Sequence, residues 1–261
     1  MNPTTISGIN RLPQTQKREI YSRLIPPELL TIFNLSTDLV DDSGNDLLKL
    51  NCPSGSTTTE MQLHHRIDFP DPILYGHITD TLNGQLHILL YVLNNPNSPR
   101  FDVDRMPDGS KTVFGTKIRN LDAEKAAMEY GLAPGQIRKG LRLLGAAIIG
   151  FERFVKCLGQ DIYFVEPLYY HNAYIFERYG FSYAKGKALM ERIQNGFETG
   201  GNLISMLDGS TPFRKPKAAD NIRLRSWAIH DGILGQPFTN VTMYKQVDVD
   251  AKVNTSVDCP W

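Results

Sequence analysis

Residues 169–171, Tyr-Tyr-His, are the densest group of proton-transfer side chains in the sequence. They follow a short apolar strand predicted over residues 162–166, and Pro167 stops the strand ladder because proline has no N–H to donate. Pockets form at strand ends in layered α/β proteins, and His and Tyr are natural general acids and bases. We therefore predict that these residues lie at the mouth of the main pocket, with Tyr170 and His171 catalytic and Tyr169 in contact with substrate.

One carboxylate stands at the same strand end. Glu166 is the candidate base that would take a proton from a reacting group. The alternative is a structural ion pair with a nearby arginine, since such pairs also perturb carboxylates. Asn172 and Tyr174, in the helix expected next, are further candidate contacts to substrate, and Asn172 also suits a helix N-cap.

A basic, glycine-bearing segment precedes the strongest helical pattern, which spans about residues 137–158. Free backbone N–H groups at a helix N-terminus, together with cations and glycines, form an anion site that suits phosphate or pyrophosphate. The alternative is a solvated basic face whose glycines allow close packing. The candidate cofactor-binding residues here are Arg138, Lys139, Gly140, Arg142 and Gly145.

The histidines of the N-terminal half lack the spacing of a metal site. His64 and His65 are neighbours in a predicted strand, so their side chains point to opposite faces. A site made from one of them with His77 and Asp80 is the alternative, but no spacing demands it. We predict no bound metal and no permanently bound cofactor.

Composition limits the class of protein. The chain has 261 residues, 41% of them hydrophobic, and its 28 basic residues balance 28 acidic ones. A chain without net charge is not held to nucleic acid or membrane by bulk electrostatics, although a local basic patch stays open. No apolar run is long enough to span a bilayer, and the N-terminus lacks a signal-peptide core. Three scattered cysteines are typical of reduced thiols, so we expect a cytoplasmic protein.

Turn and strand signals predict a mixed sheet. Asn83-Gly84 joins two apolar runs as a hairpin turn, because both residues tolerate positive φ. A helical arm over residues 15–34, broken at Pro26-Pro27, comes before the sheet. The predicted strands cover residues 61–68, 73–81, 84–93, 100–104, 162–166, 222–229 and 239–247.

These elements indicate an α/β (α+β) fold with a mixed central sheet and flanking helices. A helical crossover between residues 100–104 and 162–166 would make those two strands parallel. A further helix is predicted over residues 187–197. We expect three parts: an N-terminal helical arm (1–45), a core that contains the sheet (46–190) and a C-terminal extension packed on the core (191–261).

The order hairpin, strand, basic helix, strand and short helix ending in "ERYGF" resembles the GNAT superfamily of acyl-CoA-dependent N-acyltransferases. In that family an Arg/Gln-x-x-Gly-x-Gly/Ala loop at a helix start cradles the CoA pyrophosphate. Residues 142–147, Arg-Leu-Leu-Gly-Ala-Ala, fit this pattern. The resemblance, over about residues 60–185, implies an acyl-CoA or acyl-carrier-protein thioester as co-substrate and a small amine as acceptor.

The chain also departs from the family pattern. When the sequences are aligned on Gly180-Phe181, the family's catalytic Tyr falls on Phe176, which has no hydroxyl. Asn172 stands three residues late for the usual Asn. Tyr170 and His171, with Tyr174 and Tyr179, are the candidates to replace the missing acid.

Residues 98–105, "SPRFDVDR", resemble the Ser-Arg-Phe strand of acyl-homoserine-lactone synthases and related N-acyl amino acid synthases. Those enzymes are similar to GNAT proteins in fold and take acyl chains from acyl carrier protein or CoA. The resemblance implies that Arg100 and Phe101 contact substrate and that acyl carrier protein is a possible partner.

Two functions stay open on these observations. The first is transfer of an acyl group from a thioester to an amine, with a base, a hydrogen-bonded carbonyl and an acid for the leaving thiolate. The second is a non-catalytic protein that binds a small molecule or partner on the same fold, which the missing Tyr favours. A V-shaped split between residues 101–105 and 162–166 would favour transfer, and a closed sheet would favour binding. The sequence does not define an oligomeric state.

Overall fold

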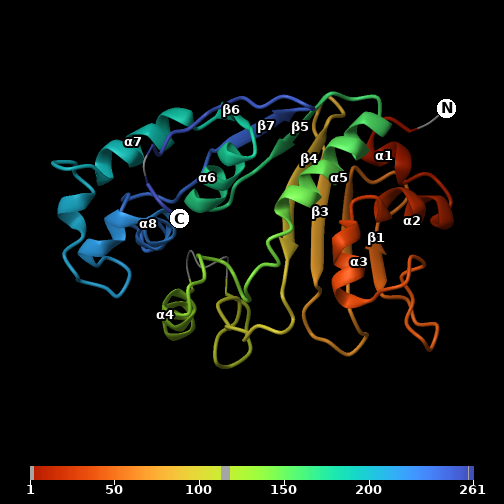
Figure 1. Ribbon diagram of the computed structural model, residues 1–261, viewed down its shortest axis with the longest axis horizontal. Coiled ribbons are helices and arrows are strands. Elements are labelled where there is room, and N and C mark those ends of the chain that lie inside the picture. Colours follow the sequence, from red (N-terminus) through yellow and green to blue (C-terminus); the bar gives the residue numbers. More distant parts are fainter. Residues whose placement is uncertain (1–2, 113–117, 258) are drawn as a thin grey trace. The chain divides into compact units, whose positions relative to one another are not determined.

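The computed structural model describes residues 3–112, 118–257 and 259–261 (Figure 1). The strands are β1 (Leu48–Asn51), β2 (Thr58–Leu63), β3 (Leu74–Asp80), β4 (Leu86–Leu93), β5 (Ile162–Val165), β6 (Ser182–Lys185) and β7 (Thr242–Gln246). The α-helices are α1 (Ile6–Ile9), α2 (Gln14–Ser22), α3 (Pro27–Phe33), α4 (Leu121–Glu129), α5 (Leu144–Cys157), α6 (Tyr170–Arg178), α7 (Lys187–Phe197) and α8 (Ile222–His230). Two short 3-10 helices are η1 (Ile204–Met206) and η2 (Pro216–Asp220).

The strands form one mixed sheet of seven strands in the order β1-β2-β3-β4-β5-β7-β6. The first four strands are antiparallel neighbours in sequence order. β4 and β5 are parallel, and the chain between them includes α5, as a parallel crossover requires. The expected mixed α/β fold is therefore confirmed.

By contacts, the chain divides into two compact units, each assembled from stretches far apart in the sequence. Unit 1 contains residues 1–97, 140–166 and 244–250, and unit 2 contains residues 98–139, 167–243 and 251–261. Neither unit coincides with one of the three consecutive parts expected from the sequence.

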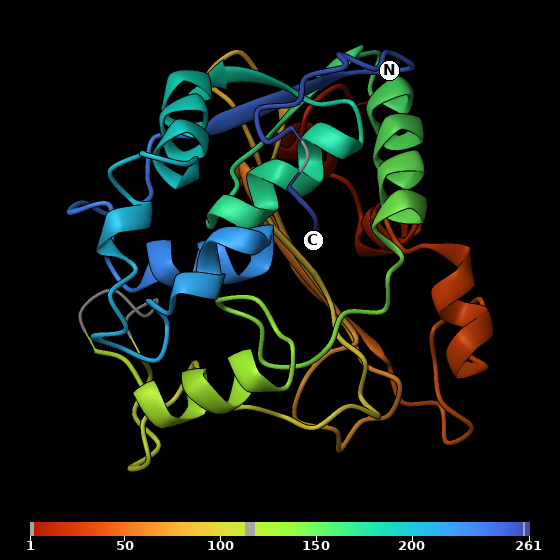
Figure 2. The same ribbon diagram turned by 60° about the vertical axis from the view of Figure 1, so that its left-hand side comes forward.

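In unit 1 the helices pack on one face of the strands, as the views in Figures 1 and 2 show for α1, α2, α3 and α5. Phe151 of α5 contacts the rings of Tyr91 on β4 and Tyr163 on β5, with ring centroids 4.8 and 6.2 Å apart. Tyr21 of α2 stacks on Phe154 of α5. These aromatic contacts hold α5 against the two parallel strands, because ring pairs contribute beyond the area they bury.

Unit 2 has its own core around the fully buried Trp227 of α8. Its indole N–H donates to the Leu132 carbonyl at 2.8 Å, and its ring stacks on Phe213. The other buried members of this cluster are Val103, Ala127, Met128 and Leu132.

Several local predictions are confirmed. The helical arm is present as α2 and α3, with the break at Pro26-Pro27. The hairpin at Asn83-Gly84 joins the antiparallel β3 and β4, and Gly84 has a φ of +78°. The predicted strands at 162–166 and 239–247 correspond to β5 and β7, and the helix at 187–197 is α7.

Two predicted strands are wrong. Residues 100–104 form a turn, because the Arg100 guanidinium pairs with Asp102 and Asp104 and the Arg105 N–H bonds the Asp102 carbonyl. The parallel neighbour of β5 is therefore β4. Residues 222–229 belong to helix α8, whose N-terminus is capped by Asn221 through a 2.8 Å bond from the Leu224 N–H.

The basic helix also begins later than predicted, at Leu144 instead of residue 137. Arg142 has a left-handed φ of +59°, which helical residues do not adopt. Just before it, Gly140 bridges Asn94 at the end of β4. Among the described residues, no helix combines the length and the apolar character that crossing a bilayer needs.

Candidate functional site

The two parallel strands of unit 1 separate soon after they meet. β4 and β5 pair only at His87 with Phe164 and at Ile88 with Val165, and the last bond runs from the Glu166 N–H to the Ile88 carbonyl at 3.4 Å. β5 then ends, whereas β4 continues to Leu93. The second half of β4 therefore runs on without β5 beside it.

A β-bulge lies at the point of separation. On β3, Ile78 pairs with Ile88 and His77 pairs with Leu90, so Leu89 of β4 has no partner across the ladder. A bulge bends its strand, increases the local twist and disrupts the ladder, and bulges are common beside active sites. All residues of β4 from Leu89 to Leu93 are apolar or aromatic and half-buried, which suits contact with an apolar group.

The start of α5 is held at the end of the same strand. The Leu141 N–H donates to the Leu93 carbonyl at 3.3 Å, and α5 begins three residues later without a side-chain cap. The first N–H groups of an uncapped helix point outward at its positive end. Arg142 is exposed beside them in a conformation that costs a non-glycine residue about 1–2 kcal/mol. Such strain persists where the surrounding structure imposes it, often at ligand sites.

The predicted anion site is therefore smaller than expected. Gly145 lies in the first turn of α5 and Arg142 just before it, but Arg138 and Lys139 are not part of the helix start. Arg138 is buried and its guanidinium donates to the Ser98 carbonyl. The Lys139 N–H donates to Ser98 Oγ at 3.1 Å, and its ammonium lies 4.4 Å from the ring centroid of Tyr130.

Glu166 lies exposed directly after β5, at the separation of the two strands. Within the described part of the chain it makes no ion pair, so the alternative of a structural pair with an arginine is not supported. Burial lowers the pKa of the nearby His87, and the Glu166 carboxylate partly opposes this shift. His87 Nε2 is buried and has no hydrogen-bond partner among the described residues.

Tyr170 and His171 do not lie at a pocket mouth, so that prediction is wrong. Both are first-turn residues of α6, which begins two residues earlier than Asn172, and they are 0% and 3% exposed. The Tyr170 hydroxyl bonds Ser256 Oγ at 2.9 Å, and burial raises its pKa. Because α6 begins at Tyr170, both side chains lie in the interior of unit 2.

Both ring nitrogens of His171 are engaged. The Asn172 side-chain oxygen accepts the Tyr169 N–H at 3.2 Å, so its Nδ2 is the group that faces His171 Nε2. An amide nitrogen can only donate, which makes Nε2 the acceptor and leaves the proton on Nδ1, bonded to Ser226 Oγ at 2.9 Å. Burial lowers the pKa of His171 to about 3, with His230 adding to the shift. His171 is therefore a neutral structural residue.

The remaining candidate contacts are also occupied within unit 2. The Tyr174 hydroxyl donates to the Cys259 carbonyl at 3.0 Å, and Phe101 packs beside Tyr130. Arg100 is held by Asp104 at 2.8 Å. Tyr169 stacks on His171 at 5.7 Å, and burial raises its pKa to about 12.

A buried ionic network in unit 2 was not predicted. Glu124 accepts hydrogen bonds from His230 at 3.1 Å and from Arg119, which also pairs with Asp231 at 3.0 Å. Arg214 completes the chain of charges with a 2.9 Å bond to Asp231. Burial alone would raise the pKa of Glu124, but the bonds from His230 and Arg119 outweigh it and lower the pKa. The network joins two distant segments: Glu124 and His230 are 106 positions apart and Arg119 and Asp231 are 112 apart, so no local sequence pattern reveals it.

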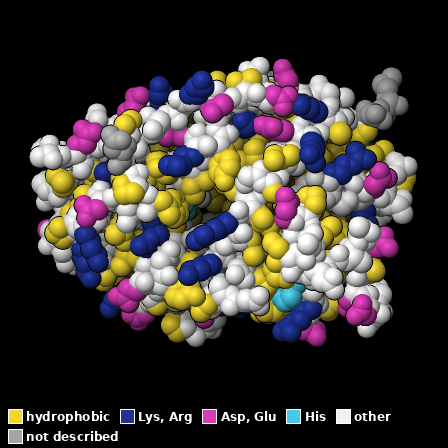
Figure 3. Space-filling view, in the orientation of Figure 1, with side chains coloured by type: hydrophobic (Ala, Val, Ile, Leu, Met, Phe, Trp, Pro, Cys, Tyr) yellow, Lys and Arg dark blue, Asp and Glu magenta, His cyan; other side chains and the backbone are white. Residues whose placement is uncertain are grey.

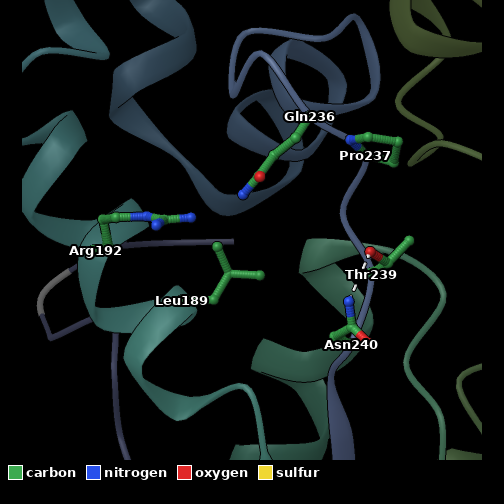
Figure 4. Close-up of a pocket in the computed structure, with 6 residues that line it drawn as sticks. All are labelled: Leu189, Arg192, Gln236, Pro237, Thr239 and Asn240. Carbon is green, nitrogen blue, oxygen red and sulfur yellow. Dashed lines mark hydrogen bonds between the residues drawn. The ribbon is translucent and has the colours of Figure 1, made fainter.

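The charged side chains of both signs are spread over the face of the molecule in Figure 3. Within the described ranges, no group of three or more His, Cys, Asp or Glu residues is placed to hold a metal ion. A shallow pocket of about 290 Å³ lies beside α7 in unit 2, and none of the residues predicted from the sequence lines it (Figure 4).

Comparisons of the chain with protein-family models, with curated proteins and with solved structures found no significant match.

Proposed function

We propose that this protein is an acyltransferase that moves an acyl group from a CoA or carrier-protein thioester to an amine acceptor. The observation that carries the proposal is the separation of β4 and β5 at the Leu89 bulge, with Glu166 at its edge. In unit 1 the β3–β4 hairpin is followed by α5 and the parallel strand β5, an order that supports the GNAT-like fold that the sequence resembles. The proposal uses β4 in the place where residues 100–104 were expected.

The donor would lie along the second half of β4. The half-buried apolar side chains from Leu89 to Leu93 suit an acyl chain or the thioester arm. At the end of the strand, the uncapped start of α5 suits a phosphate of CoA or of a carrier-protein arm, with Arg142 and Gly145 beside it. Disrupted strand N–H groups at the bulge are the candidates to hold the thioester carbonyl.

Glu166 is the proposed base. The amine nitrogen attacks the thioester carbon as its proton passes to the carboxylate, and the carbon–sulfur bond breaks to release a thiolate. The proton on Glu166 can then neutralise that thiolate, so the reaction ends in an amide and a thiol. We keep Glu166 in this role and assign Tyr170 and His171 structural roles, since both are buried away from solvent.

The experiment begins with a thermal-shift screen against CoA and acyl-CoAs of increasing chain length, followed by amine acceptors with amide formation read by mass spectrometry. Glu166→Gln should lower the turnover number by about 10²–10⁴-fold, the usual effect of removing a general base. Asp161→Asn, an exposed acid before the other end of β5, is the matched control and should leave the rate unchanged. Absence of any thioester binding, or full activity of the Gln variant, would refute the proposal.

A further inference from the structure

A groove in unit 2 has the features of a ligand site separate from the proposed acyl-donor site. It is formed by two adjoining pockets of about 290 and 420 Å³, which share Arg192 of α7 and Gln236. We call it the α7 groove. Figure 4 shows the side chains of Arg192 and Gln236 directed toward the same space above Leu189.

Arg192 is the single charged residue that lines either pocket of the α7 groove. Within the described ranges it has no ion pair or hydrogen bond, and the same is true of the Gln236 side chain. The adjacent acid on α7, Glu191, pairs instead with Lys187 at 3.6 Å. An unpaired guanidinium beside an unengaged amide is a donor set that matches a carboxylate, which arginine binds with two parallel bonds.

Next to Arg192 and Gln236, the larger pocket is lined by apolar residues, which we call the apolar wall. Its aliphatic lining comes from Ile193, Leu203, Met206, Ile233 and Leu234. The wall is held in place: the Leu203 N–H donates to the Gly196 carbonyl at 2.9 Å, and a Cβ on Gly196 would lie 2.6 Å from the Leu203 side chain. On the other side, the Ile233 N–H bonds the Ala228 carbonyl at 3.1 Å. A pre-formed wall reduces the ordering cost of binding.

We infer that the α7 groove binds an amphipathic monocarboxylate, with the carboxylate on Arg192 and Gln236 and an aliphatic body along the apolar wall. The combined lining has one positive charge, several amides and no acid, which disfavours cationic ligands. The pocket volumes suit a small molecule of about eight to twelve heavy atoms in the usual range of ligand sites.

The inference is tested by titrating the full chain with sodium octanoate in calorimetry and ligand-observed NMR. Octanamide, which has the same chain without the charge, and acetate, which has the charge without the chain, should each bind at least about tenfold more weakly. Arg192→Gln should weaken octanoate binding at least about tenfold, a change of about 1.4 kcal/mol. Lys187→Gln, on the same helix but outside the lining, should change it less than about twofold.

Met206→Glu gives an independent check of the apolar wall, since Met206 is 40% exposed and its replacement should not disturb the fold. It should weaken octanoate binding through charge repulsion while the melting temperature stays within about 2 °C. The inference fails if octanoate does not bind at millimolar concentration, if Arg192→Gln binds it as the wild type does, or if acetate or octanamide binds equally well.

Discussion

Acid should destabilise this protein through His171. The ring is buried, its Nδ1–H bonds Ser226, and its Nε2 accepts from Asn172. Adding a proton to Nε2 would place two donors against each other and bury a charge near His230. The pKa of His171 is therefore about 3 in the folded protein, compared with about 6.5 for an unperturbed imidazole.

The sign of the effect follows from proton binding. Below pH 6.5 the unfolded chain binds a proton on this histidine that the folded protein does not, so stability falls as the pH falls toward 3. One pKa unit corresponds to about 1.4 kcal/mol, so the loss at pH 5 is about 2 kcal/mol relative to pH 7. At pH 3, where the folded-state group is itself half protonated, the loss is about 4 kcal/mol, close to the lower end of whole-domain stabilities.

The assay is urea unfolding at pH 7, 6 and 5, followed by circular dichroism. Between pH 7 and pH 5, the free energy of unfolding of His171→Gln should fall by about 2 kcal/mol less than that of the wild type, because the glutamine amide does not titrate. His77→Gln, which alters a half-buried histidine of β3 bonded to Thr58 of β2, is the histidine-to-glutamine control outside the His171 site. If His171→Gln and the wild type lose the same stability from pH 7 to pH 5, the assignment of a neutral buried imidazole is wrong.

Three further predictions concern backbone and capping. Gly135→Ala should lower the free energy of unfolding in urea by about 2–4 kcal/mol, because the added Cβ would lie 2.5 Å from the Tyr169 ring and φ is +78°. In the control Gly209→Ala, φ is +76° but the added Cβ meets open space, so the free energy of unfolding should fall by only about 1 kcal/mol. Arg142→Gly should be more stable than Arg142→Ala by about 0.5 kcal/mol, because glycine relieves the left-handed strain, and both variants should weaken CoA binding equally in calorimetry. Asn221→Ala should lower the melting temperature through loss of about 1 kcal/mol at the start of α8, and an unchanged melting temperature would exclude that cap.

Elements set by neighbouring residues could be predicted from the sequence. The Asn83-Gly84 turn joins β3 and β4 through the backbone freedom of two adjacent residues, and the apolar stripe of α5 repeats every three or four positions. The start of α5 could not be placed, because Arg142 adopts a conformation that its own residue type disfavours. Residues 222–229 alternate like a strand, but Asn221 caps a helix and Trp227 supplies the core of unit 2.

The candidate site was predicted in part. The position of Glu166 follows from the end of β5, which is a local signal. The Leu89 bulge depends on the register between β3 and β4, and no sequence pattern within either strand defines it. His171 and Tyr170 have the residue types of a catalytic pair, yet their partners Ser226 and Ser256 are 55 and 86 residues away in the chain.

The ribosome makes β5 long after β4, and this delay affects the newly made chain. His87 pairs with Phe164, 77 residues further along the chain. At translation rates of about 5–20 residues per second, β4 stays without its parallel neighbour β5 for roughly 4–15 s. Its sequence, LHILLYVL, contains no proline, glycine, acid, lysine or arginine, which is the composition of a segment that pairs with other chains when its edge is bare. Newly made chains should therefore depend on chaperones during this interval, and expression at lower temperature should raise the yield of folded protein.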